Sequence, residues 1–212
     1  AKNLRFVTVV TYPIDYSKVI EEMKNNNGST SEKTRFILGQ KVYARAAQYN
    51  AAIANYLSDQ VNDMNLSSPF MRSYEDGNEL RYGENSHQKA WLYVDKDCPD
   101  AGIAQTDILH GKPMSYNNYV DGEGALEAVK ELAGTPGVAI VKHTNPCGYA
   151  TGSDLNEAFN AAWSGDPISA FGSVVAFTEK IDIKVAKSLE GRFVEAVIAP
   201  GYDDDAFEFL VK

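Results

Sequence analysis

Cysteine and histidine are scarce in this 212-residue chain, which has two cysteines and three histidines. Cys98 and Cys147 lie far apart, so a disulfide framework is not expected and a reducing cytoplasm is the expected location. Neither CxxC nor HxxxH spacing occurs. Since zinc sites use such ligand patterns, we expect no metal site.

Long apolar runs and an excess of basic residues are also absent. No run approaches the ~18 apolar residues of a membrane-spanning helix, so no membrane association is expected. The first residues lack the features of a signal peptide and an initiator Met, and we expect the chain to begin inside a longer protein. A net charge of −9 argues against nucleic acid as a partner. A few local cations could still bind one phosphorylated small molecule.

The N-terminal third has its own organisation. Residues 5–12 read as a strand, and a short helix follows that ends at Asn25–Gly28. Ser29 and Glu32 fit a capping box that opens a long helix from about Thr30 to Leu57. Its small residues recur at helical spacing and would permit close packing. The polar stretch 58–78 is the predicted boundary.

Beyond the boundary, strands and helices alternate. Strands are predicted at 91–94, 138–143, 173–177 and 196–199, and helices at 121–132, 155–163 and 182–189. This alternation predicts an α/β layered sheet with right-handed crossovers.

The segment Val138–Gly148 is an apolar run that ends in a cation, an imidazole and a predicted turn at Asn145-Pro146. Lys142 and His143 therefore lie where a buried strand surfaces, and ligands collect at such places in open α/β sheets. His143 suits a general base because its ordinary pKa is about 6.5. The residues alone leave open a surface lysine beside a structurally hydrogen-bonded histidine.

Four segments are richer in polar residues and glycine than folding requires. They are Leu80–Gln88, Ser115–Asn118, Lys142–Gly148 and Asp166–Gly172. In this order they resemble the transformylase part of the AICAR formyltransferase/IMP cyclohydrolase family. That family carries Arg-Tyr-Gly-x-Asn-Pro-His-Gln, Tyr-Asn-Asn, Lys-His-x-Asn-Pro-Cys-Gly and Asp-Pro-x-Ser-Ala-Phe-Gly segments. A fifth segment, Phe193–Pro200, is similar to the family's Phe-Val-Glu-x-Ile-Ile-Ala-Pro.

The resemblance covers essentially the whole chain and implies a domain plan. Residues 1–65 would be a C-terminal remnant of the cyclohydrolase domain with its linking helix, and 66–79 a linker. Residues 80–212 would be the first half of the transformylase domain, a three-layer α/β/α, cytidine-deaminase-like fold without the deaminase zinc motif. Fold alone therefore does not predict deamination.

The implied activity is formyl transfer from 10-formyltetrahydrofolate to the 5-amino group of AICAR, which gives FAICAR in purine biosynthesis. The parent protein would also cyclise FAICAR to IMP and form a homodimer. No metal is implied at the catalytic site. Because the family's folate-binding elements lie in its second half, we expect the isolated chain to be inactive. A non-catalytic nucleotide-binding fragment is the alternative.

The resemblance assigns catalysis to Lys142 and His143. The amine of the acceptor is a poor nucleophile, so a base must remove its proton and a cation or donor must stabilise the oxyanion. His143 suits the role of base, and Lys142 suits either the oxyanion role or that of a proton relay. Lys2 matches a catalytic lysine of the cyclohydrolase domain, but its phosphate-binding companions are missing here. A lone lysine near a chain end is usually solvated, so we expect Lys2 to be inactive.

Substrate contacts are implied at further positions, each with an ordinary structural reading beside it. Arg81 and Tyr82 would hold the nucleotide, although a loop salt bridge is the reading without the resemblance. Gly172 would let a backbone N–H approach a ligand, or is a turn glycine. Glu195 would bind ribose hydroxyls, or is a solvated carboxylate. Two asparagines complete the predicted substrate site: Asn117, which could instead cap a turn together with Asn118, and Asn145.

Two motif positions depart from the family, Ser86 in place of Pro and Ser173 in place of a second Gly. Neither removes a chemically active group, although Ser86 could loosen its loop. Cys147 and His143 could also form a nucleophile–base pair of a hydrolase. The competing reading of Cys147 is a small packed residue.

Overall fold

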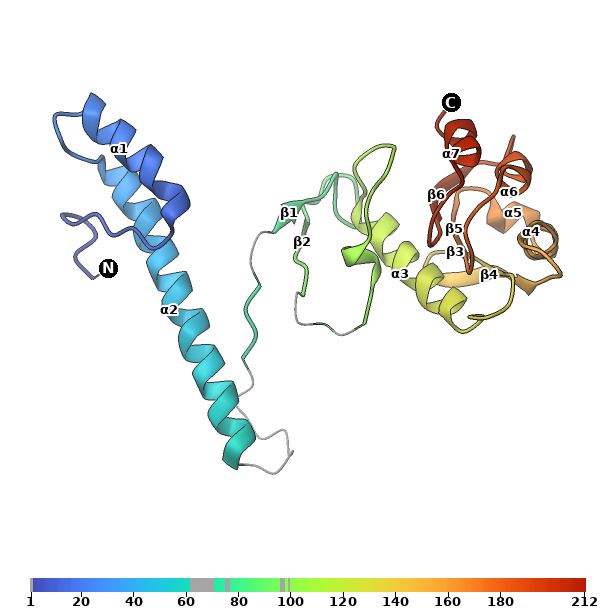
Figure 1. Ribbon diagram of the computed structural model, residues 1–212, viewed down its shortest axis with the longest axis horizontal. Helices are drawn as coiled ribbons and strands as arrows, with labels where there is room; N and C mark the ends of the chain where they lie inside the picture. Colours follow the sequence, from blue (N-terminus) through green and yellow to red (C-terminus); the bar gives the residue numbers. More distant parts are fainter. Residues whose placement is uncertain (1, 62–70, 75–76, 96–97, 99) are drawn as a thin grey trace. The chain divides into compact units, whose positions relative to one another are not determined.

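The computed structural model describes residues 2–61, 71–74, 77–95, 98 and 100–212 (Figure 1). The chain divides into an N-terminal unit, Ala1–Ser73, and a C-terminal unit, Tyr74–Lys212. Of the predicted 66–79 linker, residues 66–70, 75 and 76 lie outside the described part. The assignment of domain identities to the two units stays a prediction.

The N-terminal unit is a helical hairpin. A 3-10 turn, η1 (Pro13–Asp15), leads into α1 (Tyr16–Asn25), and α2 follows at Glu32–Val61. Lys41 on α2 forms a 2.7 Å ion pair with Asp15, while Val19 and Leu38 are buried between the helices. The predicted long helix is confirmed. Its first turns pack on α1, whereas Ala44 and Ala47 of the small-residue stripe are exposed.

Two local expectations in this unit are wrong. Residues 5–12 do not form a strand, because the described part of the unit offers no neighbouring strand for their backbone groups. Phe6 instead donates its N–H to the carbonyl of Asn3. The helix cap is Ser31, whose hydroxyl accepts from Thr34 N at 3.2 Å. Ser29 lies outside the helix.

The C-terminal unit is a mixed α/β domain, which confirms the α/β class. A short antiparallel pair, β1 (Asn78–Glu79) and β2 (Trp91–Leu92), precedes the 3-10 turn η2 (Ile103–Gln105). The remaining elements are α3 (Tyr116–Lys130), β3 (Gly137–Lys142), β4 (Asn145–Thr151), α4 (Leu155–Gly165), α5 (Pro167–Ala170), β5 (Ser173–Phe177), α6 (Ile183–Ser188), β6 (Val194–Ile198) and α7 (Asp204–Leu210).

The main sheet has the order β4-β3-β5-β6. β3 runs antiparallel to both β4 and β5, and only β5 and β6 are parallel. The predicted alternation of strands and helices is therefore confirmed. The expectation that crossover connections link the strands throughout the sheet is wrong. β3 and β4 are joined by a tight hairpin, which the alternation pattern missed because β4 lacks an apolar run.

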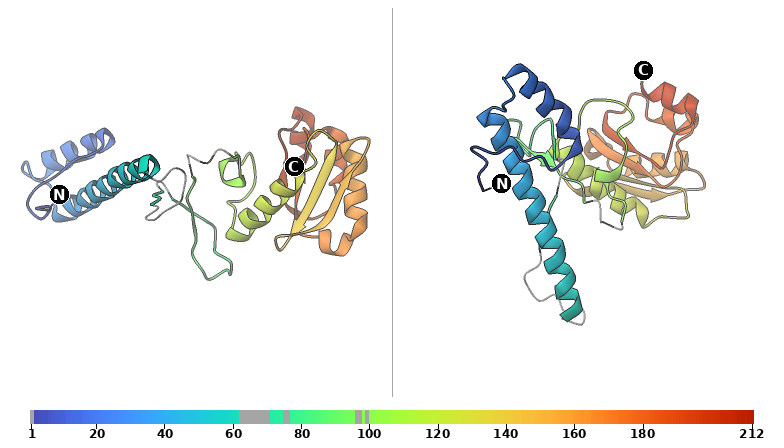
Figure 2. Two further views of the ribbon diagram at one scale, coloured as in Figure 1. Left: turned by 90° about the horizontal axis from the view of Figure 1, so that it is seen from below. Right: turned by 60° about the vertical axis from the view of Figure 1, so that its left-hand side comes forward.

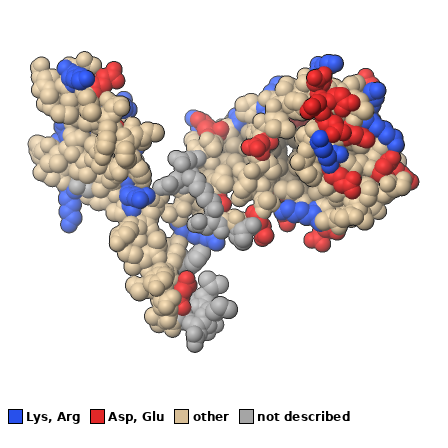
Figure 3. All heavy atoms as spheres, viewed as in Figure 1, with Lys and Arg blue, Asp and Glu red and all other residues tan. Residues whose placement is uncertain are grey.

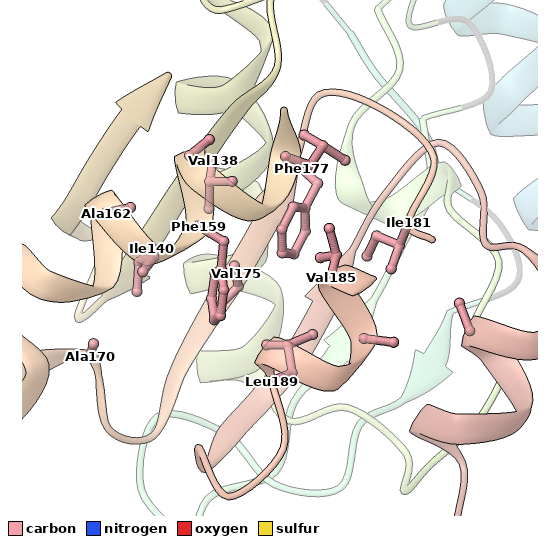
Figure 4. Close-up of a cluster of buried hydrophobic side chains, with 14 residues drawn as sticks. Val138, Ile140, Phe159, Ala162, Ala170, Val175, Phe177, Ile181, Val185 and Leu189 are labelled. Carbon is pink, nitrogen blue, oxygen red and sulfur yellow. The ribbon is translucent and has the colours of Figure 1, made fainter. Parts of the chain in front are cut away.

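Helices cover both faces of this sheet (Figure 2). On one face α4, α6 and α7 pack over the fully buried Val138, Ile140 and Val175 (Figure 4). On the other face α3 packs its Ala125 and Val129 over the alternate positions of the same strands. Because side chains alternate across a strand, both faces of β3 are apolar, and every residue of the strand before Lys142 is buried.

Carboxylate and hydroxyl caps fix where the helices begin. Ser115 caps α3, Asp154 caps α4, Asp166 caps α5 and Asp182 caps α6. Each accepts the N–H three residues ahead, which satisfies a helix donor that has no partner within the helix. The predicted helix at 121–132 begins earlier, at Tyr116, because Ser115 and Asn118 form a capping box.

Charged side chains of both signs are scattered over the face of the C-terminal unit drawn in Figure 3, and acidic atoms gather at α7. None of the helices in the described ranges is long and apolar enough to cross a membrane.

Candidate functional site

Lys142 and His143 lie at the turn of the β3–β4 hairpin. Lys142 is the last residue of β3 and pairs with Asn145, so His143 and Thr144 alone make the turn. Both adopt positive φ, 55° and 64°. The expected turn at Asn145-Pro146 is therefore wrong, since these residues open β4. Proline is tolerated there because β4 is an edge strand of the sheet.

The two side chains differ in their surroundings. His143 is exposed, while Lys142 is half-buried and donates to the carbonyl oxygen of Phe171 at 2.7 Å. A strand that surfaces at Lys142 is confirmed. The end of β3, however, lies beside the amino ends of β5 and β6, because β3 runs in the opposite direction to these two strands. The rule for carboxyl ends of parallel strands does not describe this edge.

The N-terminal part of α3 brings three of the sequence motifs together. Asn117 donates to the carbonyl oxygen of Glu84 at 3.0 Å, which ties the helix to the first motif. Asp121 accepts the Thr144 N–H at 2.7 Å, which ties it to the hairpin turn. Asn118 closes the capping box with Ser115 and also lies 3.4 Å from Arg81 Nη2. Both asparagines thus have structural partners.

Arg81 and Tyr82 form one unit. The guanidinium stacks over the Tyr82 ring at 4.9 Å and donates to the Tyr82 hydroxyl at 3.2 Å. Arg81 is exposed, and among the described residues it has no ion pair with a carboxylate. The loop salt bridge is therefore not seen there, and the guanidinium has donors free for an anion.

The fourth and fifth motifs meet beside Lys142. Phe171 and Phe193 stack at 5.2 Å between ring centroids, and Gly172 donates its N–H to Phe193 O at 2.8 Å. Gly172 has φ of 74°, a conformation that favours glycine. Its N–H donates within the chain, and a substrate contact at Gly172 stays a prediction.

Two β-bulges lie at this same end of the sheet. Ser173 pairs with Val194 and Val174 with Ala196, so Glu195 is the extra residue of one bulge and is exposed. The other bulge, between β3 and β4, has Cys147 as its extra residue. Bulges re-aim side chains and are frequent next to active sites. Asn145, beside the turn, donates its side-chain amide to His143 O at 2.9 Å.

Burial raises the pKa of the Cys147 thiol, with Asp166 adding to the shift and Lys142 opposing it. The thiol donates to Ile140 O at 3.5 Å. A raised pKa leaves less thiolate at neutral pH, which disfavours the cysteine-nucleophile alternative. Asp166 itself accepts from Ser169, and these hydrogen bonds lower its pKa. It caps the start of α5.

Two features of this unit could not be predicted from the sequence. The Ser173 hydroxyl is fully buried and has no hydrogen-bond partner within the described residues. A cavity of about 320 Å³ lies at the opposite end of the sheet, where β5 and β6 end, lined by residues that include Val129, Phe177 and Ile198. None of the predicted site residues lines it.

The structure thus gathers Arg81, Tyr82, Asn117 and Lys142–Asn145 around α3 and the hairpin, with Gly172 beside Lys142. Lys2 belongs to the N-terminal unit, where it is exposed in a turn. Among the described residues, no group of three or more His, Cys, Asp or Glu could hold a metal ion.

Fold and site together define an α/β domain with a polar, cation-bearing site at one end of its sheet. Comparison with known proteins gives the family. The family model of the AICARFT/IMPCHase bienzyme matches residues 1–212. The bifunctional purine biosynthesis protein PurH of Lactobacillus acidophilus is 44% identical over all of this chain and 41% of its own length. PurH of Bacillus thuringiensis is 41% identical over 99% of this chain and 40% of its own length. The chain therefore belongs to the AICARFT/IMPCHase bienzyme family, and it spans about two fifths of these relatives.

Proposed function

We propose that this chain supplies the proton acceptor, the oxyanion-stabilising cation and part of the nucleotide site for formyl transfer to AICAR. The observation that carries the proposal is the pairing of a half-buried Lys142 with an exposed His143 at one strained turn. Membership of the bienzyme family supports it. 10-Formyltetrahydrofolate is the proposed formyl donor, and no metal takes part.

The proposed chemistry uses both side chains of the turn. The 5-amino nitrogen of AICAR attacks the formyl carbon, and neutral His143 takes the proton that this nitrogen loses. The formyl oxygen becomes an oxyanion, which the Lys142 ammonium stabilises. Collapse of the tetrahedral intermediate breaks the bond to N10 of the folate, and N10 receives a proton. The products are FAICAR and tetrahydrofolate.

Arg81 is the proposed contact for the AICAR phosphate, because its exposed guanidinium can offer two parallel N–H donors. Tyr82 holds that guanidinium in place by stacking. Asn117, Asn145, Gly172 and Glu195 remain proposed substrate contacts on the basis of the family motifs. Glu195 lies on a bulge that leaves this residue exposed.

The complete protein is proposed to cyclise FAICAR to IMP as well, to form a homodimer and to work in the cytoplasm. Lys2 would be a remnant of the cyclohydrolase site. The expected division into a cyclohydrolase remnant at 1–65 and a transformylase half-domain at 80–212 belongs to this proposal. The alternative is a fragment that binds the nucleotide without turnover.

The test is a formyl-transfer assay with 10-formyltetrahydrofolate and AICAR. We expect no turnover by the 212-residue chain, and turnover by a polypeptide that carries it at the full length of the family. In the longer polypeptide, His143→Ala should lower kcat by about 10²–10⁴-fold. Arg81→Ala should chiefly raise KM for AICAR.

Cys147→Ala is the control, because the thiol is adjacent to the turn but has no role in the proposed chemistry. It should leave kcat within about twofold, as expected for a substitution that removes no transition-state contact. Loss of turnover in Cys147→Ala, or full turnover in His143→Ala, would contradict the proposal. Turnover by the isolated chain would contradict the expectation that the fragment is inactive.

A further inference from the structure

The turn that presents His143 is held in an unfavourable backbone conformation. His143 and Thr144 both have positive φ, although neither is glycine. For a β-branched residue such as Thr144 this conformation is a genuine outlier, because Cβ crowds the backbone. Such strain persists only where the surroundings enforce it, and it is concentrated at functional sites.

Three hydrogen bonds act on the turn, and two of them are local to it. Thr144 Oγ1 and Asn145 Nδ2 both donate to the carbonyl oxygen of His143, at 2.7 and 2.9 Å. The third comes from another element, since Thr144 N donates to Asp121 Oδ1 at 2.7 Å. A short hydrogen bond to a carboxylate is stronger than one between neutral groups.

Asp121 is well placed for this contact. It is half-buried on α3, six residues beyond the Ser115 cap. The helix passes directly beside the turn, because a Cβ added to Gly124 would lie 3.6 Å from Thr144 O. α3 also contacts Arg81 through Asn118. Helix α3 therefore contacts both the hairpin turn and the Arg81 guanidinium.

We propose that Asp121 is a positioning residue for His143. Its carboxylate holds the strained turn through the Thr144 N–H and so fixes the imidazole where the proton must be taken up. This inference rests on the proposed role of His143 as proton acceptor. Asp121 acts through the backbone and takes no proton itself.

The first test uses the 212-residue chain and does not depend on catalysis. Asp121→Ala removes the acceptor, whereas Asp121→Asn keeps an oxygen and loses only the charge. Glu123→Ala is the matched control, because Glu123 on the same helix accepts the Ile103 N–H at 2.7 Å, away from the turn. Amide hydrogen exchange of Thr144 is followed by NMR, together with an amide of β5 that reports global unfolding.

We expect Asp121→Ala to speed exchange at Thr144 by about tenfold or more relative to the β5 amide, as loss of a hydrogen bond to a charged group predicts. Asp121→Asn should fall between Ala and the unmodified chain, and Glu123→Ala should leave the Thr144 ratio unchanged. Equal Thr144 protection in all variants would overturn the proposal. If Asp121→Ala does not fold, the Asn variant alone decides: unchanged Thr144 protection overturns the proposal.

The second test is kinetic, in the full-length polypeptide. Asp121→Ala should lower kcat while KM for AICAR changes little, and Asp121→Asn should recover part of the loss. A drop no greater than that of Glu123→Ala would overturn the positioning role and leave His143 as base untouched. Full turnover in His143→Ala would instead overturn the proposed function, so the two failures are distinguishable.

Discussion

The ammonium of Lys142 donates a 2.7 Å hydrogen bond to the carbonyl oxygen of Phe171, 29 residues further along the chain. This bond ties the end of β3 to the segment between α5 and β5. Its acceptor is neutral, and no carboxylate of the described residues pairs with Lys142. An ammonium carries three N–H donors, so others remain for an oxyanion. Fixed position and unused donors are what the proposed chemistry needs from this lysine.

Alkylation of the two cysteines should differ. Burial raises the pKa of the Cys147 thiol above its ordinary value of 9.0, so thiolate forms there only at more alkaline pH. Cys98 is exposed. We expect iodoacetamide to label Cys98 well before Cys147 at pH 7.5, with Cys147 labelling rising steeply above about pH 9. Mass spectrometry of the labelled peptides measures both rates, and the single variants Cys98→Ala and Cys147→Ala are the controls. Faster labelling of Cys147 at neutral pH would revive the nucleophile alternative.

The buried strands could be predicted because their residues leave little choice. Val138–Val141 and Val174–Phe177 are β-branched or apolar at nearly every position, and such runs are typical of strands covered on both faces. Helices α4 and α6 begin at acidic caps, Asp154 and Asp182, which are local signals. The strand predicted at 173–177 is confirmed as β5.

The hairpin turn could not be predicted, since its conformation depends on a distant residue. His143-Thr144 carries none of the Asn or Gly signals of a two-residue turn, whereas Asn145-Pro146 does carry turn signals. The contact with Asp121 on α3 favours the less expected alternative. Convergence of the motifs at one sheet end was implied by the family resemblance, but the contacts that produce it are tertiary.

Two glycines should respond oppositely to alanine. A Cβ at Gly148 would lie 2.5 Å from the carbonyl oxygen of Ala162, so Gly148→Ala must push β4 away from α4. We expect a loss of about 1–3 kcal/mol in the free energy of unfolding. Gly165 ends α4 with open space around it, and Gly165→Ala should stabilise by up to about 1 kcal/mol. Urea denaturation followed by circular dichroism compares the two, and equal effects would refute the packing argument.

Asp154 should make stability depend on acid pH. A 2.6 Å bond from Lys184 and then the Glu157 N–H lower its pKa below the ordinary 3.8. A lowered pKa in the folded state means that the carboxylate stabilises the fold above about pH 4 and that this contribution is lost as the pH falls through the lowered pKa. Lys184→Met should therefore flatten the decline in thermal stability between about pH 4 and 2. Lys187→Met, on the same helix, should keep this decline in thermal stability. In 1 M salt the attraction between Lys184 and Asp154 should be screened.

The last prediction concerns the core behind the site. Phe159 is fully buried, 5.8 Å from both Trp163 and Phe177 between ring centroids, and the Arg192 guanidinium lies 4.8 Å above its ring. Phe159→Ala removes this ring from between α4 and the sheet, and the cavity should cost about 3–5 kcal/mol.

Phe193→Ala is the matched control, because that ring is half-exposed and packs only on Phe171 among the aromatic side chains described; its loss should cost about 1 kcal/mol or less. Urea unfolding monitored by circular dichroism gives both values. Since β3 carries Lys142 on the sheet that Phe159 supports, the Phe159 variant should also weaken Thr144 amide protection. Comparable unfolding free energies for the two variants would show that α4 does not hold the sheet through this ring.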